Sequence, residues 1–181
     1  MSDYTGSNTP VEIRNLWQTP IELFAALDRE FRFVGDAAAS DENHLHGRYL
    51  TEEDNALEVE WDTFFPAGNI WCNPPYSDVG PWVEKASTID SDEHGVVMLV
   101  PADISVGWFA TAQKTCSEIR FIIGGRISFV RSDTKKSVNG NNKGSMLLIW
   151  NPHMLNRCAV SFIERDFMYQ YGRSILGRSA A

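Results

Sequence analysis

The sequence predicts an α/β domain with a mostly parallel, doubly wound β-sheet, and three observations carry this prediction. Residues 95–100 form a continuous apolar run closed by Pro101, as is typical of a strand in the middle of a parallel sheet. Short apolar runs at 69–72, 119–123 and 146–150 alternate with segments of helical pattern. The chain has 181 residues, 43% of them apolar, which is enough for the core of one domain.

The N-terminal third begins with a polar stretch, residues 1–16, that we expect to be a flexible arm; the single domain then spans 17–181. A helix is predicted over 19–30, with Thr19 as its N-cap, Pro20 at its first position and Glu22 completing a capping box. The i, i+4 spacing of its apolar residues predicts one buried face, made of Leu23, Phe24, Leu27 and Phe31.

The remaining elements follow in order along the chain. Residues 31–34 are predicted to be the first strand, ending in a turn at Gly35 and Asp36, and 48–50 a second strand. Another strand covers 69–72, and Pro81 opens the next helix. After the 95–100 strand we expect a helix over 105–117 and strands at 119–123 and 146–150, the last of these pairing near the sheet edge.

The charge is distributed unevenly along the chain. The net charge is −8, yet residues 1–110 hold 5 Lys and Arg against 20 Asp and Glu, and residues 111–181 hold 11 against 4. A polyanion is attracted by a local basic face and not by the total charge. The basic C-terminal third therefore permits a nucleic-acid partner, although an ordinary acidic protein with a basic tail has the same distribution.

Several classes of protein are disfavoured. No apolar run approaches the roughly 20 residues of a membrane-spanning helix, and the polar N-terminus resembles no secretory signal. Three widely spaced cysteines predict reduced thiols in a cytoplasmic protein. His44 and His46 with Cys72 are a weak zinc pattern, so we expect no metal.

The chemically most informative motif is Asn73-Pro74-Pro75-Tyr76, which follows the predicted strand 69–72 directly. Ligands of open α/β sheets bind beyond the carboxyl ends of the strands. The Asn73 side-chain oxygen and the Pro74 carbonyl can accept both hydrogens of a planar amino group, which frees the nitrogen lone pair. The two prolines fix φ and so preset this geometry, and Tyr76 offers a flat face for stacking. The alternative is a strand-terminating turn with Tyr76 in the core.

The order of the motifs resembles that of the phage-type DNA N6-adenine methyltransferases, the Dam family of bacteriophages and prophages. The resemblance covers roughly residues 16–150. It implies a Rossmann-like S-adenosylmethionine-dependent methyltransferase fold. Its residues, in chain order, are Trp17-Gln18-Thr19-Pro20, the 36–43 segment from Asp36 to Asn43, the 53–57 segment followed by Trp61, 71–77 around the Asn-Pro-Pro-Tyr motif, 99–103 and 125–129.

The resemblance implies a cofactor site. Trp17, Thr19 and Pro20 would border the methionine end of S-adenosylmethionine, although Thr19 and Pro20 are equally explained as a helix start. Asp36, followed by Ala37, would accept from the cofactor's ammonium, unless Asp36 is only a turn residue. The last cofactor-binding residue that the resemblance implies is Asp54, which would accept from the adenine or ribose of the cofactor. The alternative is that Asp54 belongs to a solvated acidic face.

One departure concerns the loop after the first strand. Many methyltransferases have a Gly-x-Gly pattern there, whereas this chain has only Gly35, ahead of Asp36, and alanines follow. Alanine is small enough for a close approach to a cofactor but does not readily take positive φ.

The DNA-binding residues are expected around a long polar loop near 130–144. Its Lys135, Lys136 and Lys143 suit contacts to phosphates and base edges, together with Arg126 before the loop. Phe129 could sandwich an extruded base against Tyr76, or simply close a strand. A solvated surface loop is the alternative for the basic segment.

The sequence thus predicts a phage- or prophage-encoded enzyme that methylates adenine N6 in double-stranded DNA, as in restriction-modification. Two alternatives stay open. One is the same chemistry on RNA adenine or protein glutamine, because each acceptor is a planar NH2 group. The other is a catalytically silent DNA-binding module. No feature of the sequence predicts an oligomeric state or a target sequence.

Overall fold

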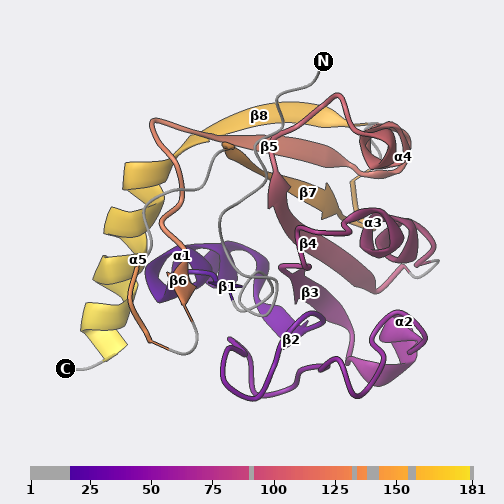
Figure 1. The fold of residues 1–181 in the computed structure, drawn as a ribbon, viewed down its shortest axis with the longest axis horizontal. Helices are drawn as coiled ribbons and strands as arrows, with labels where there is room; N and C mark the ends of the chain where they lie inside the picture. Colours follow the sequence, from indigo (N-terminus) through magenta and orange to yellow (C-terminus); the bar gives the residue numbers. More distant parts are fainter. Residues whose placement is uncertain (1–16, 90–91, 132–133, 138–142, 155–157, 180–181) are drawn as a thin grey trace.

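The fold is built on one six-stranded β-sheet with the strand order β2-β3-β4-β7-β5-β8 (Figure 1). The computed structural model describes residues 17–89, 92–131, 134–137, 143–154 and 158–179. Three neighbouring pairs, β2–β3, β3–β4 and β5–β8, are parallel, and β7 runs antiparallel to both β4 and β5. The strands are β2 (Phe33–Asp36), β3 (Gly68–Cys72), β4 (His94–Pro101), β5 (Glu118–Ile123), β7 (Ser145–Trp150) and β8 (Ala159–Glu164).

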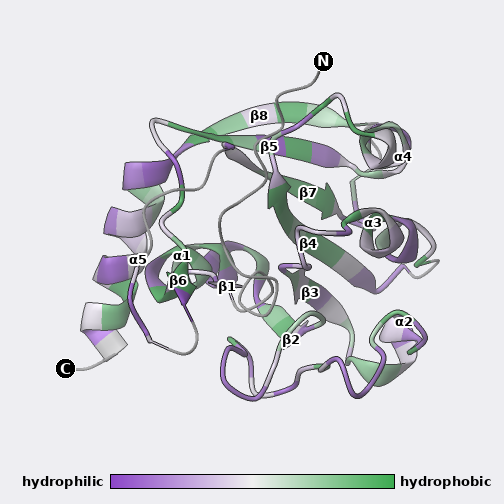
Figure 2. Ribbon diagram, in the orientation of Figure 1, coloured by the Kyte–Doolittle hydropathy of each residue, from purple (hydrophilic) through white to green (hydrophobic). Residues whose placement is uncertain are grey.

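Helices cover both faces of the sheet, as in a doubly wound fold (Figure 1). On one face lie α1 (Ile21–Phe31) and α5 (Arg165–Ser179), which bury Leu27 and Met168 against the sheet. On the other face lie α3 (Gly80–Ser87) and α4 (Gly107–Thr115), with the short α2 (Trp61–Phe64) beside them. Figure 2 shows that two hydrophobic strands, β4 and β7, run side by side through the middle of the sheet. The predicted α/β fold is therefore confirmed.

The position of β7 contradicts the sequence-based expectation. Residues 146–150 were expected to pair near the sheet edge, but β7 lies between β4 and β5 and is buried over most of its length. Because β7 is antiparallel, it places its first residue, Ser145, beside the last residue of β4, Pro101. The true edge strand on that side is β8, which the sequence pattern did not reveal.

The start of α1 is also different from the prediction. Pro20 is the N-cap and Thr19 lies outside the helix; its hydroxyl is buried and has no hydrogen-bond partner among the described residues. No side chain caps the first turn, so the predicted capping box with Glu22 does not form. The predicted buried face is present, since Leu23, Phe24 and Leu27 are buried.

Smaller differences affect other elements. The first long strand is β2, which starts at Phe33 and includes Asp36, two residues later than predicted. The 48–50 segment is no regular strand; it joins β2 through one bridge, Asp36 to Tyr49, and through backbone hydrogen bonds. The helix expected over 105–117 is shorter at both ends. The N-terminal arm, residues 1–16, lies outside the described residues.

Helix α5 packs closely on α1. A Cβ atom added at Gly172 would meet the backbone carbonyl of Glu22, so the two helices approach at a position that only glycine permits. Gly177, one and a half turns further along α5, has open space instead.

No helix within the described ranges is long and apolar enough to cross a membrane. In the same part of the chain, no group of three His, Cys, Asp or Glu side chains is arranged to hold a metal ion.

Candidate active site

The candidate site lies at the carboxyl ends of β2, β3 and β4. These strands are parallel neighbours, so their last residues lie side by side at the carboxyl ends of the strands. Asp36 ends β2 and pairs in register with Trp71 of β3, and Asn73 follows β3 directly. The topology therefore brings together Asp36 and the Asn-Pro-Pro-Tyr motif, as the sequence predicted for ligand sites of α/β sheets.

Asn73 is held in one orientation by the backbone of the N-terminal segment. Its side-chain Nδ2 donates to the Trp17 carbonyl at 3.3 Å. This contact fixes the amide plane and turns the other end, Oδ1, away from Trp17. Oδ1 is buried and has no hydrogen-bond partner in the part of the chain that the structure describes. Buried polar atoms are nearly always paired, so an unpaired acceptor at this place indicates a site for a donor that is absent from the chain itself.

Among the residues that the structure describes, the buried hydroxyl groups without a hydrogen-bond partner include those of Thr19, Tyr76 and Ser145. Ser145 shares a face of the sheet with Asn73. In β4 and β7 this is the face of Leu99 and Leu147, which pack with Trp71 of β3 under α1. Since only β4 separates β7 from β3, the Ser145 hydroxyl lies about 10 Å across the sheet from the line of β3.

Ser145 was not singled out from the sequence. The signal that could have found it is a small polar residue at the start of an otherwise apolar strand, Ser145–Trp150. That signal is weak, because a serine at a strand end is ordinary unless the strand is known to begin at the ligand edge.

Tyr76 packs against Phe129 edge to face, with ring centroids 5.7 Å apart and an interplanar angle of 88°. Burial raises the pKa of the Tyr76 phenol far above its ordinary value, so the group stays neutral. Phe129 is buried, and its ring is perpendicular to that of Tyr76. A sandwich of the kind expected from the sequence requires one ring to turn.

Asp36, the last residue of β2, carries a buried carboxylate. It accepts from the backbone N–H of Leu45 at 3.1 Å and of Ala38 at 3.3 Å. Burial nevertheless raises its pKa from 3.8 to about 6, because these hydrogen bonds and the nearby His44 offset only part of the desolvation. A carboxylate that is costly to ionise is well suited to a cationic ligand, which would supply the missing charge.

The loop after β2 does not depend on the Gly-x-Gly pattern. The position of Gly35 is explained by packing, since a Cβ atom there would collide with the Phe65 ring. Ala37 is fully buried and its N–H donates to the Trp71 carbonyl at 2.8 Å. The turn after β2 is thus tied to β3 with alanine in place of glycine.

Asp54 is exposed and has a local structural partner. Its Oδ2 accepts from the Thr51 N–H at 2.8 Å and from the Thr51 hydroxyl at 2.7 Å. These hydrogen bonds lower the pKa of Asp54, and they stabilise the turn that follows the 48–50 segment. A carboxylate has further acceptor positions, so this turn and a ligand contact are compatible.

The short ribbon of β1 (Trp17–Gln18) and β6 (Val130–Arg131) joins the site to the basic segment. Trp17 pairs with Arg131 and Gln18 with Val130 in antiparallel register. The same Trp17 residue accepts the hydrogen bond from Asn73. The ribbon therefore places the beginning of the 130–144 loop beside the Asn-Pro-Pro-Tyr motif.

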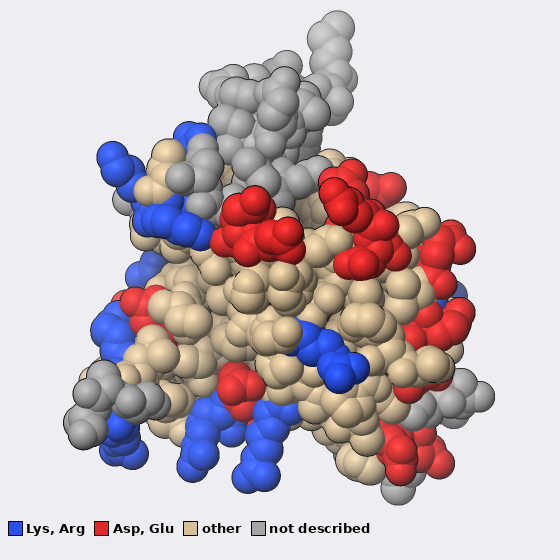
Figure 3. Space-filling view, turned by 90° about the horizontal axis from the view of Figure 1, so that it is seen from below, with Lys and Arg blue, Asp and Glu red and all other residues tan. Residues whose placement is uncertain are grey.

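The basic residues expected to bind DNA occupy different environments. Lys143 forms an ion pair with Asp103, and the Lys135 ammonium donates to the Glu42 carbonyl at 2.8 Å. Lys136 and Arg126 are exposed. Figure 3 shows Lys and Arg gathered mainly toward the left, the side of α5 in Figure 1, and Asp and Glu toward the right. Residues 132–133 and 138–142 of the loop lie outside the described residues.

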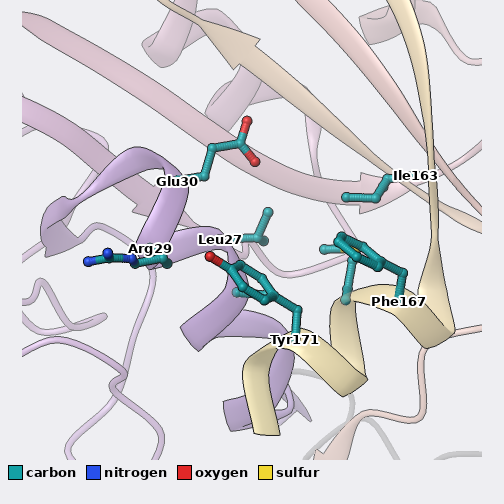
Figure 4. Close-up of a pocket in the computed structure, with 8 residues that line it drawn as sticks. Leu27, Arg29, Glu30, Ile163, Phe167 and Tyr171 are labelled. Atoms are coloured by element: carbon teal, nitrogen blue, oxygen red, sulfur yellow. The ribbon is translucent and has the colours of Figure 1, made fainter. Parts of the chain in front are cut away.

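A separate depression of about 420 Å³ lies between α1 and α5 (Figure 4). None of its lining residues belongs to the candidate site, so we assign it no part in the reaction. The lining residues are Ala26, Leu27, Arg29, Glu30, Ile163, Phe167, Met168 and Tyr171.

The chain is similar in sequence to known proteins over most of its length. Residues 6–175 match the family described as DNA N-6-adenine-methyltransferase (Dam). A DNA N-6-adenine-methyltransferase of Escherichia phage T1 is 37% identical over 163 residues, which cover 81% of this chain and 66% of the phage protein. A DNA N-6-adenine-methyltransferase of Haemophilus phage HP1 (strain HP1c1) is 34% identical over 152 residues, or 82% of this chain and 85% of the relative.

Proposed function

The chain belongs to the DNA N-6-adenine-methyltransferase (Dam) family, and from this premise we propose that it transfers a methyl group from S-adenosylmethionine to N6 of adenine in double-stranded DNA. The family assignment agrees with the resemblance of the motifs and removes the reason to prefer RNA or protein as acceptor. The roles of individual residues, the donor and the duplex form of the substrate are parts of the proposal.

The observation that carries the proposed chemistry is the unpaired Oδ1 of Asn73. Its partner nitrogen is anchored on Trp17, so the side chain presents an acceptor and not a donor to the ligand. An exocyclic amino group is the donor of matching chemistry. With the Pro74 carbonyl as second acceptor, both N6 hydrogens of adenine are held.

Holding both hydrogens changes the nucleophile. The N6 lone pair of adenine is delocalised into the ring, and two acceptors favour a pyramidal nitrogen whose lone pair points toward the methyl carbon. The new N–C bond forms as the methyl–sulfur bond breaks, and N6 loses a proton to solvent afterwards. Because Pro74 and Pro75 fix the backbone, this geometry exists before the substrate arrives.

The cofactor would lie against the turn after β2. S-adenosylmethionine supplies, when bound, a methyl group on a sulfonium that needs no further activation. The buried Asp36 carboxylate suits its ammonium, and the unpaired Thr19 hydroxyl offers a second polar contact. Trp17, Pro20 and Ala37 would line the same part of the site, and Asp54 would accept from the ribose or adenine.

The duplex would be bound through the basic residues at and next to the 130–144 loop, with the target adenine extruded into the site. Tyr76 and Phe129 are the aromatic faces for that base, and one of the rings turns to admit it. Arg126, Lys135, Lys136 and Lys143 are the proposed DNA contacts, with Lys143 acting from its ion pair with Asp103.

The test measures methyl transfer from labelled S-adenosylmethionine to duplex DNA by the full chain and three variants. Asn73→Ala removes the acceptor, and we expect kcat to fall at least about 100-fold. Asn73→Asp keeps an acceptor oxygen but loses the bond to Trp17, so it retains intermediate activity. Asn151 follows the last residue of β7, at the end of the sheet opposite to Asn73, so we expect Asn151→Ala to keep full activity.

Each outcome has a distinct meaning. Full activity of Asn73→Ala contradicts the role of the amide oxygen. Label in protein or in cytosine contradicts the proposed acceptor. A chain that binds DNA but shows no thermal shift with S-adenosylmethionine or S-adenosylhomocysteine is a catalytically silent module instead.

A further inference from the structure

We propose that Ile104 is the wedge that enters the base stack when the target adenine leaves the duplex. The inference rests on the proposed function, and it adds a residue for which neither the sequence motifs nor the catalytic chemistry has a use. Ile104 has the highest exposed fraction, 66%, of the large apolar side chains that the structure records as exposed. Single exposed apolar residues are ordinary on protein surfaces, so its position and support decide the matter.

Ile104 lies at the carboxyl ends of the strands, where the reaction would take place. Ile104 follows β4 by three residues, and β4 is the parallel neighbour of β3, which leads into Asn73. Other strongly exposed apolar residues, Val160 and Phe162 on β8 and Phe167 on α5, lie at the far edge strand and its helix. Two less exposed isoleucines, Ile21 at the start of α1 and Ile123 at the end of β5, are also on the surface. Ile104 is the most exposed of the three, and it follows the strand that pairs with β3.

The turn that carries Ile104 is braced on both sides. The Asp103 carboxylate accepts from the Ser105 N–H at 3.0 Å and from the Ser105 hydroxyl, so the two neighbours of Ile104 are clamped together. The Asp103 N–H donates to the Pro101 carbonyl at 2.9 Å. The side chain of Ile104 thus projects from a fixed apex and not from a loose loop.

The same turn is tied to the basic loop. Asp103 forms its ion pair with Lys143, and the Ala102 N–H donates to the Gly144 carbonyl at 2.9 Å. The pair neutralises the carboxylate that stands beside Ile104, which removes its repulsion of DNA phosphates. A phosphate-binding segment and an apolar apex are therefore held in one unit next to the catalytic motif.

Duplex DNA is the partner that matches this arrangement. When a base is extruded, its stacked neighbours lose contact and a gap opens in the helix. DNA-bending and base-extruding proteins insert an apolar side chain, often Ile, Leu, Met, Phe or Pro, between base steps to stabilise such a state. A β-branched side chain on a fixed turn loses little conformational freedom on insertion, because its χ1 rotation is already restricted.

The test uses the full chain and a duplex that contains one methylation site mapped beforehand with the parent protein. Extrusion is read from the fluorescence rise of 2-aminopurine in place of the target adenine, and catalysis from kcat/KM on the adenine duplex. With Ile104→Ala, the fluorescence rise is lost and kcat/KM falls about tenfold or more. Ile104→Leu retains most of both, and the matched control Val160→Ala, also an exposed β-branched residue, changes neither.

A second duplex separates a wedge from a plain binding contact. Opposite a mismatched base or an abasic site, the target adenine is already partly unstacked, so Ile104→Ala recovers to within about threefold of the parent protein. Equal activity of Ile104→Ala and parent on the paired duplex overturns the inference, and so does an equal loss on both duplexes. Absence of transfer by the parent protein on every duplex overturns the proposed function, and the wedge with it.

Discussion

The substitution Asp36→Asn gives the sharpest thermodynamic prediction. In the unfolded chain the pKa of Asp36 is the ordinary 3.8, and in the folded protein burial raises it to about 6. The folded state therefore binds the proton more tightly, and ionisation of Asp36 destabilises the fold. Between about pH 4 and pH 6 the contribution of Asp36 to the free energy of unfolding falls as pH rises, by about 3 kcal/mol in total.

Asparagine cannot ionise, so it isolates this effect. Urea denaturation of both proteins across pH 3.5 to 8 should show the parent losing about 3 kcal/mol relative to Asp36→Asn over that window, with a constant difference above about pH 7. The pH-independent part of the difference also contains the loss of one hydrogen bond. The two Asp36 oxygens accept from two N–H groups, whereas an asparagine amide accepts only through Oδ1. A difference that is flat with pH, or that increases with pH in favour of the parent, refutes the reasoning.

The pKa of Asp36 also predicts how cofactor binding depends on pH. If ionised Asp36 accepts from the ammonium, the Kd of S-adenosylhomocysteine for the parent protein increases about tenfold per pH unit below the pKa near 6. Asp36→Asn binds more weakly and without that pH dependence. Calorimetric titration at several pH values measures both, and an unchanged pH profile in the variant removes Asp36 from the cofactor site.

Three further predictions concern packing and the basic loop. Gly172→Ala should lower the free energy of unfolding by about 1–3 kcal/mol because α1 and α5 must separate, while Gly177→Ala, in open space, should raise it by about 0.5–1 kcal/mol; thermal melts compare the two. Gly35→Ala should destabilise the fold by a similar 1–3 kcal/mol through its collision with Phe65, and an unchanged melting temperature would show that this packing is not tight. Lys143→Met should raise the pKa of Asp103, which the ion pair now lowers, and increase KM for DNA; carboxyl NMR titration and steady-state kinetics are the measurements.

The parts of the structure that the sequence predicted are those in which local chemistry is decisive. The apolar run of β4 indicates the fold class, and Asn73-Pro74-Pro75-Tyr76 indicates a planar amino group as the ligand. The family was indicated by the order of all the motifs together. The edge strand β8 was missed because its residues alternate between exposed and half-buried, so no continuous apolar run marks it.

Other features depend on contacts between distant segments. Thr19 was predicted either to cap a helix or to border the cofactor, and the structure excludes the cap because Pro20 is the N-cap. Two residues earlier, Trp17 pairs with Arg131 and accepts from Asn73, contacts that join distant segments. The position of Ser145 beside the last residue of β4 follows only from the antiparallel placement of β7 between β4 and β5. Tertiary placement decided these positions, and no local propensity encodes it.

The most direct test of the central claim is the chemical identity of the methylated product. Duplex DNA incubated with the full chain and methyl-deuterated S-adenosylmethionine is digested to nucleosides and examined by mass spectrometry. We predict label in N6-methyldeoxyadenosine alone, absent when Asn73→Ala replaces the parent protein. Label in a cytosine derivative, or equal labelling by both proteins, would contradict the assignment of Asn73 as the residue that holds the adenine amino group.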